Sequence, residues 1–513
     1  MRALRFTLLL IALTVSLARV AFIESHWDED ACMAIGWLLS KGWRLYSGIF
    51  THHTPLDYLP ASLLADVFGP STTAMRAFMI ALWAIVAATL YRALRPRAVG
   101  AWTAVFFAIL SSQWLTYWYG QMMLVENYWG YAVVLALALL GSPLELEPDP
   151  SPRRAVAVGA LIALILTASP VCFPVAALLA LWVVADGRWR GLSRWSAVGA
   201  AGWLALFGLW AFAHADLGRL WEHVIVFNRE VYARFYGLEN RAVLGFWQLA
   251  LEHSVAYFAS TFDARNLEMY FEGLIKIVAL GWVAWSLANR RWAQAVWKLA
   301  FIVVLQSRPE KTADAPPFHA APFYLTATLI AASAIARTWQ ALSGRPRVAF
   351  AVAAAGLLLP TLWATSFATA SLRPFSRPDA VYESILAAVR TCTTPEDRVA
   401  ALPCDPRFYL DTARVPATPS VFYLPWQEAW EPQRRATLDS LRRERPKVVL
   451  IQDTKVWGVP WNEFGAGINA WLKAAGYMPV MRSMDPAAPL RVQLLVRPDA
   501  APAFVACAQE TAR

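Results

Sequence analysis

Long apolar stretches separated by short polar turns fill the first 367 residues of the chain. A helix needs about 20 apolar residues to cross a bilayer, and on that rule the pattern predicts about eleven membrane spans. The first run follows Arg2 and Arg5 as a signal peptide would. No small-residue cleavage pattern precedes Asp28, so we interpret this run as a membrane anchor. The predicted spans lie near 6–23, 73–91, 98–118, 122–141, 155–169, 171–185, 196–215, 271–287, 295–306, 320–336 and 348–367.

Five of the polar turns between these spans are strongly basic. With eleven spans they all fall on the side of the N-terminus, and the positive-inside rule places that side in the cytoplasm. The basic segments are Arg92–Arg97, Arg153–Arg154, Arg188–Arg194, Arg290–Arg291 and Arg337–Arg347. The outer side then receives loops 24–72, 216–270 and 307–319, the turn near 119–122, and everything after 368.

After Phe367 the apolar runs become too short to span a bilayer. Helical periodicity appears near 378–391 and over Asn462–Ala475, where Gly476 provides a stop. The segment 403–435 is rich in Pro and aromatic residues and is predicted to be a long ordered loop. Short apolar strands are predicted at Arg398–Leu402, Val448–Gln452 and Leu490–Val496. We therefore expect a membrane module over 1–373 and a small soluble α/β domain over 374–513 on the outer side.

The composition supports this polytopic α-helical architecture. Hydrophobic residues make up 58% of the chain and charged residues 16%, whereas soluble domains carry about 25% charged residues. The net charge of +10 could suggest nucleic acid, but basic cytoplasmic loops account for it. Five cysteines are too few for a disulfide scaffold. Cys392, Cys404 and Cys507 fall in the outer domain, where one pair could be oxidised; the sequence does not say which.

Three acidic residues, Asp28, Glu29 and Asp30, directly follow the first predicted span. Charge at this depth is costly and often functional. A helix is predicted from about Ala31 to Lys41, ended by Gly42, with an apolar side that would lie along the membrane surface. The alternative is that Asp28 or Asp30 serves only as the N-cap of this helix.

The segment 27–60 resembles the first outer loop of GT-C glycosyltransferases, most closely the group of protein O-mannosyltransferases and lipid A aminoarabinose transferases. The shared pattern is Asp28-Glu29, Leu38-Leu39, Gly42, Leu45-Tyr46 and Thr54-Pro55-Leu56-Asp57-Tyr58. Members of this group are polytopic enzymes that use polyprenyl-phosphate-linked sugars. The chain departs from the pattern at Ala31-Cys32 and His52-His53, and the sequence does not allow the resemblance to be assigned over 374–513.

The implied reaction suits a carboxylate in this loop. Transfer from a lipid phosphate to an alcohol needs a base for the acceptor proton, and a carboxylate partly buried near lipid is a better base than one in water. We expect Asp28 or Glu29 to be this catalytic base; the sequence does not distinguish them. Asp30, Tyr46 and His53 are candidate substrate-binding residues.

Further candidates lie in other outer loops. The resemblance implies that Glu126, at the outer end of the fourth span, lies near the donor sugar; the alternative is a lone interfacial Glu. The phosphate leaves as a stable anion, so the site needs cations around it more than a strong acid. Arg308, Lys311 and His319 in loop 307–319 could supply them. The alternative for Arg308 and Lys311 is interfacial snorkelling.

With the predicted topology, the resemblance implies a membrane glycosyltransferase, which we expect in a bacterial inner membrane. It would transfer a sugar from a polyprenyl-phosphate donor to a hydroxyl of a lipid, glycan or protein at the outer face. No nucleotide motif is present, no cofactor is predicted, and His52-His53 lacks a third ligand for a metal. One alternative is a transporter or flippase for lipid-linked glycans, although the paired repeats of transporters are not found. A non-enzymatic scaffold is another, and it leaves the three acids unexplained.

Overall fold

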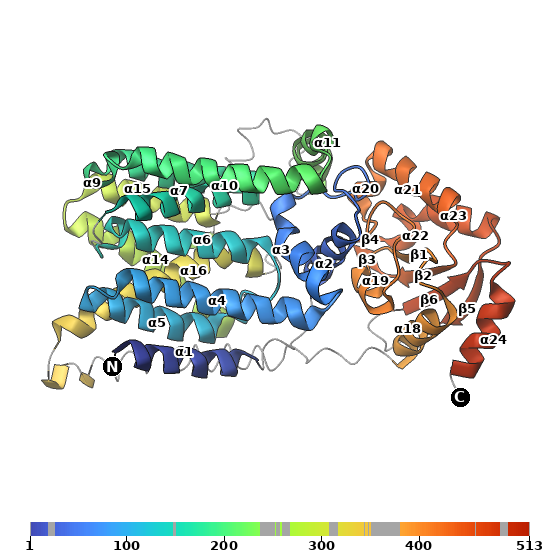
Figure 1. Cartoon of the computed structure of the whole chain (residues 1–513), viewed down its shortest axis with the longest axis horizontal. Helices are drawn as coiled ribbons and strands as arrows, with labels where there is room; N and C mark the ends of the chain where they lie inside the picture. The colour runs from blue at the N-terminus through green and yellow to red at the C-terminus, as the bar shows by residue number, and fades with distance from the viewer. Residues whose placement is uncertain are drawn as a thin grey trace. The chain divides into compact units, whose positions relative to one another are not determined.

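A computed structural model describes residues 2–18, 26–146, 150–235, 252, 257–258, 267–306, 317–342, 344–346, 348–349, 380–456, 458–482 and 491–511. Its contacts divide the chain into two units, which are described separately below (Figure 1). The first unit comprises 1–23, 76–210 and 240–373, and the second comprises 24–75, 211–239 and 374–513. The second unit therefore joins the acidic loop to the C-terminal region.

The first unit is a bundle of apolar helices, as expected of an integral membrane protein (Figure 1). Among the described residues, three helices are long and apolar enough to cross a bilayer: Thr72–Leu94, Ser193–His214 and Phe318–Ala341. Shorter apolar helices accompany them, so the count of about eleven spans stays a prediction, and most of the span at 348–367 lies outside the described residues. The bounds are α1 Arg2–Ala18, α4 Thr72–Leu94, α5 Ala98–Trp114, α6 Val125–Leu140, α7 Pro152–Ala168, α8 Phe173–Ala185, α9 Gly187–Arg190, α10 Ser193–His214, α14 Leu267–Ala288, α15 Trp292–Gln306 and α16 Ala321–Ala341.

Helix α16 lies at the centre of this bundle, where it packs against α5, α6 and α14. Its residues from Ala321 to Ser333 are all buried. Helix α10 has the opposite character, because it leaves Leu206 and Leu209 exposed, as lipid-facing residues would be. Two glycines bring α7 and α10 together. A Cβ at Gly159 would meet the Ser196 carbonyl oxygen at 1.8 Å, and one at Gly199 would meet that of Val156 at 1.9 Å.

The second unit contains a four-stranded sheet in the order β1-β2-β6-β5. Strand β1 runs parallel to β2, and β6 is antiparallel to both β2 and β5. The elements of residues 380–511 are α18 Ala380–Cys392, β1 Val399–Leu402, α19 Pro406–Thr412, α20 Pro425–Glu428, α21 Glu431–Glu444, β2 Val448–Asp453, β3 Lys455–Val456, β4 Val459–Pro460, α22 Trp461–Phe464, α23 Ala466–Ala474, β5 Met478–Arg482, β6 Arg491–Val496 and α24 Ala501–Thr511. The remaining helices of the unit are α2 Trp27–Ser40, α3 Leu59–Phe68, α11 Leu217–Trp221 and α12 Ala233–Phe235, with π-helical turns at Glu222–Val226 and Asn228–Tyr232.

The expected helices and strands of the C-terminal region are largely present, with three corrections. The segment 403–435 is not one long loop, because Pro406 and Pro425 each occupy the first turn of a short helix, α19 and α20. The helix predicted over 462–475 is divided at Gly465, and the strand Met478–Arg482 was not predicted. A disulfide joins Cys392 to Cys507 and so links α18 to α24, which resolves the pairing that the sequence left open.

Candidate active site

The three acids of the first loop lie inside a helix rather than before it. Helix α2 begins at Trp27, so Asp28, Glu29 and Asp30 form its first turn. The N-cap is His26, whose Nδ1 accepts a hydrogen bond from the Asp28 backbone N–H at 3.3 Å. The predicted start at Ala31 and the proposed N-cap role of Asp28 or Asp30 were therefore wrong. Acidic side chains are stabilised in a first helical turn by the exposed backbone N–H groups there.

Asp28 and Glu29 differ sharply in exposure. The Asp28 side chain is 29% exposed and lies 3.3 Å from the His26 ring nitrogen, whereas Glu29 is 0% exposed. Burial by itself would lower the pKa of His26, but the Asp28 hydrogen bond and the charges of Asp28, Asp30 and Glu29 raise it above its ordinary value. Asp28 is therefore open to a substrate and has a proton-binding neighbour, while Glu29 is enclosed by the protein.

The loop that follows brings Tyr46 and His53, two candidate substrate-binding residues, together. The Tyr46 hydroxyl donates to the His53 carbonyl oxygen at 2.8 Å, and His53 Nδ1 lies 2.8 Å from an Asp57 carboxylate oxygen. The Cys32 thiol of α2 donates to the Asp57 carbonyl oxygen. These contacts attach the loop to the acidic helix, and the His53 side chain stays 43% exposed.

His52 lies in an aromatic cluster, and its ring is also 4.3 Å from that of His53. Its ring lies 5.7 Å from that of Phe227 and 4.6 Å from that of Tyr232. Phe227 in turn contacts Trp430 of the C-terminal region at 5.0 Å. Burial lowers the pKa of His52 well below its ordinary value. The two adjacent histidines thus face different surroundings. Within the described ranges, no group of three His, Cys, Asp or Glu side chains is placed to hold a metal ion.

The C-terminal region also borders the acidic helix. Helix α19 packs against α2, and the Trp27 ring meets Phe422 edge-on at 6.2 Å. Burial first, and then the charges of Asp405, Asp28 and Asp30, raise the pKa of the Cys404 thiol. The carboxyl end of β1 and the first turn of α2 are therefore close enough for their acidic groups to act on the same thiol.

Asp405 has a structural explanation within this environment. One of its carboxylate oxygens caps α19 by accepting from the Phe408 N–H at 3.2 Å. The other accepts from the Tyr382 hydroxyl at 2.5 Å and from Gln452 at 3.1 Å. Burial raises the pKa of Asp405 to about 6 despite these contacts.

In the first unit, Glu126 and His319 are brought together although they are far apart in the sequence. Glu126 lies in the first turn of α6 and is 4% exposed. His319 lies in the turn Pro317–Ala320 before α16, and its Nδ1 is 3.3 Å from a Glu126 oxygen. Both side chains were predicted to bind substrate, and a carboxylate and an imidazole at this spacing can exchange a proton. Arg308 and Lys311 lie outside the described residues.

A second acidic site in this unit was not predicted. The Glu272 carboxylate accepts hydrogen bonds from three tyrosine hydroxyls, those of Tyr117, Tyr257 and Tyr324. Lys276, one turn further along α14, places its Nζ 4.1 Å from the centre of the Tyr257 ring. The available signal was the pair Glu272 and Lys276 within or beside a predicted span, where charged residues are rare. The tyrosines come from three separate segments, so no local pattern identifies them.

Comparison with known proteins identifies the fold. No family model matches the chain, and no curated protein matches it by sequence. The chain is similar to the crystal structure of ArnT from Cupriavidus metallidurans in the apo state, with a TM-score of 0.57, 14% identity, and coverage of 97% of this chain and 98% of that one. It is also similar to ArnT from the same organism bound to undecaprenyl phosphate, with a TM-score of 0.58, 14% identity, and coverage of 96% and 98%. The chain therefore has the GT-C fold. This confirms the fold implied by the resemblance of segment 27–60 to the first outer loop of GT-C enzymes.

Proposed function

We propose that this chain transfers a sugar from a polyprenyl-phosphate-linked donor to a hydroxyl acceptor, with Asp28 as the general base. The observation that carries the proposal is the first turn of α2, where a partly exposed Asp28 lies beside His26. The GT-C fold supports it, since one solved structure with that fold binds undecaprenyl phosphate.

The proposed reaction is a single displacement at the sugar. Asp28 accepts the proton of the acceptor hydroxyl, and the acceptor oxygen forms a bond to the anomeric carbon. The bond from that carbon to the phosphate oxygen breaks, and polyprenyl phosphate leaves with the electron pair. General-base catalysis of this kind contributes about 100- to 10,000-fold. Because Glu29 is enclosed, it is better suited to holding the helix start than to reacting.

The remaining predicted residues have supporting roles in this proposal. Glu126 and His319 would bind the donor sugar through their polar atoms, since carboxylates and imidazoles accept and donate hydrogen bonds to hydroxyls. Arg308, Lys311 or both would hold the donor phosphate. Tyr46 and His53 would shape the acceptor side of the acidic helix.

The acidic helix is proposed to face the outer side of a bacterial inner membrane. The basic loops support a cytoplasmic N-terminus through the positive-inside rule. The Cys392–Cys507 disulfide belongs to the same unit as the acidic helix, and disulfides persist in oxidising compartments such as the periplasm.

The test is transfer by purified full-length protein, with a polyprenyl-phosphate sugar and a panel of hydroxyl acceptors. Asp28→Asn should lower the turnover about 100-fold or more, while Glu29→Gln should lose less activity per folded molecule. Asp66→Asn is the matched control, because Asp66 is an exposed carboxylate of the same loop. Near wild-type turnover in Asp28→Asn would contradict the assignment. Donor movement across vesicles without any transfer would favour the flippase alternative.

A further inference from the structure

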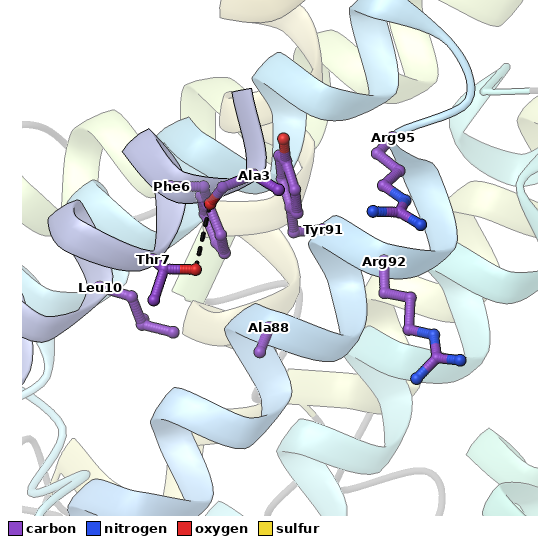
Figure 2. A pocket seen from close by; sticks show the side chains of 8 residues that line it. All are labelled: Ala3, Phe6, Thr7, Leu10, Ala88, Tyr91, Arg92 and Arg95. Atoms are coloured by element: carbon purple, nitrogen blue, oxygen red, sulfur yellow. Dashed lines mark hydrogen bonds between the residues drawn. The ribbon is translucent and has the colours of Figure 1, made fainter. Parts of the chain in front are cut away.

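A hollow lies between α1 and α4 in the first unit, at the end of the bundle where α4 finishes. Its volume is about 350 Å³. Figure 2 shows side chains from both helices around it. The lining residues are Ala3, Phe6, Thr7, Leu10, Ala88, Tyr91, Arg92 and Arg95. None of them belongs to the groups proposed to bind or transfer the sugar.

The lining changes from apolar to basic along α4. Leu10 and Ala88 form the apolar part, and Arg92 and Arg95 lie about one and two turns beyond Ala88. Phe6 of α1 stacks on Tyr91 of α4, with ring centres 4.1 Å apart and planes within 7° of parallel. This stack is a direct contact between the two helices beside the hollow.

The two arginines of the hollow differ from three partnered arginines near this end of the bundle. Arg154 donates to the Ala93 carbonyl oxygen and Arg97 to that of Leu146, and Arg337 pairs with Glu145 at 2.6 Å. In the described part of the chain, Arg92 and Arg95 make no ion pair or side-chain hydrogen bond. Arg92 lies in the last turn of α4 and Arg95 directly follows the helix, and both line the hollow, so their positive charges add at its rim.

We propose that this hollow binds one acidic phospholipid of the surrounding leaflet. Its phosphate would contact Arg92 and Arg95, and an acyl chain would follow the apolar part past Ala88 and Leu10. The lining, apolar at one part and basic at the other, fits a phospholipid better than inorganic phosphate. Inorganic phosphate has no apolar group that could contact the apolar part. Basic pockets between membrane helices are suited to acidic lipid headgroups.

A simpler explanation of the two arginines makes a different prediction. Basic residues collect at the cytoplasmic ends of spans and are stabilised at the C-terminus of a helix. On that explanation they attract acidic lipids diffusely, and the shape of the hollow has no effect. The experiment must therefore change charge and shape separately.

The measurement is retention of phosphatidylglycerol by the purified full-length protein in detergent, followed by native mass spectrometry, with phosphatidylcholine as the neutral comparison. Arg92→Gln with Arg95→Gln should reduce phosphatidylglycerol binding about tenfold or more. Arg153→Gln, which removes an exposed arginine from α7, should leave it unchanged. Ala88→Leu should also weaken binding by filling the hollow, while Ala81→Leu at another exposed position of α4 should not.

Three results would overturn the proposal. The first is equal phosphatidylglycerol binding by the double arginine variant and the wild type. The second is a full effect of the arginines with none from Ala88→Leu, which would indicate diffuse attraction. The third is displacement of the lipid by inorganic phosphate at concentrations near that of the lipid, which would indicate an anion site without an acyl component.

Discussion

Asp28 and Glu29 are adjacent in the sequence, yet the helix turns them into different surroundings. In the proposed reaction the base must reach the acceptor proton. Both residues carry a carboxylate, so their different exposure is what favours Asp28 over Glu29 as the base. The sequence identified the acidic group because charge next to a span is unusual. It could not choose between the two residues, because the choice depends on where α2 begins and on what covers Glu29.

Asp405 gives a pH-dependent prediction at this scale. Its pKa rises from 3.8 to about 6 on folding, so the folded state binds its proton more tightly than the unfolded state does. The stabilisation is complete below about pH 4 and is lost as the pH rises through 6. Two pH units correspond to roughly 3 kcal/mol. The stability of Asp405→Asn relative to the wild type should therefore increase from pH 4 to pH 7. The measurement is the thermal unfolding midpoint of both proteins, followed by tryptophan fluorescence.

The control for this prediction is Asp439→Asn, which removes an exposed carboxylate that pairs with Arg442 on α21. Its difference from the wild type should stay nearly constant over the same pH range. If Asp405→Asn instead follows the wild type throughout, the carboxyl group of Asp405 does not have the raised pKa.

Contacts between distant residues show which features of the site the sequence could predict and which it could not. Glu126 and His319 were each selected for a separate reason, and the structure places them 3.3 Å apart. Glu272 was missed, since a tyrosine cage depends on where three segments meet. A charged residue in an apolar run is visible in the sequence, but its partners are a property of the packing.

Among the elements, α7 and α10 approach so closely that glycine is required on both. Gly159→Ala or Gly199→Ala would place a Cβ within 2 Å of a carbonyl oxygen, and the helices would have to separate. Overpacking of this kind typically costs about 1–3 kcal/mol. The apparent melting temperature in detergent should fall for both variants. Gly202→Ala on α10 meets nothing within 4 Å and should be neutral or slightly stabilising, so equal behaviour of all three would contradict the close approach.

Element boundaries were less predictable than element types. The strands β1, β2 and β6 agree with their apolar runs, because their burial leaves a continuous signal. Strand β5 was missed, since it carries Pro479 and is partly exposed. Helix α2 starts four residues earlier than predicted. The prediction placed the acidic residues before the helix, whereas acidic side chains are stabilised in a first helical turn.

At the scale of the whole molecule, the topology can be tested directly. Ala503→Cys, an exposed position on α24, should react with a membrane-impermeant maleimide added to intact cells from the outer side. Gly191→Cys, in the exposed turn after α9, should react only after the membrane is permeabilised. The reverse pattern would place the C-terminal region in the cytoplasm and would remove the argument from the basic loops.

The second unit is assembled from segments that are far apart in the sequence, and these segments are synthesised at different times. The acid-bearing helix α2 leaves the ribosome early, but α19, which packs against it, comes more than 350 residues later. Most of the chain must be synthesised before α2 can acquire this neighbour. A chain truncated before Pro406 would therefore contain the membrane helices and α2, but α2 would lack its contact with α19. The environment of the proposed catalytic base would in this way form only when translation is nearly complete.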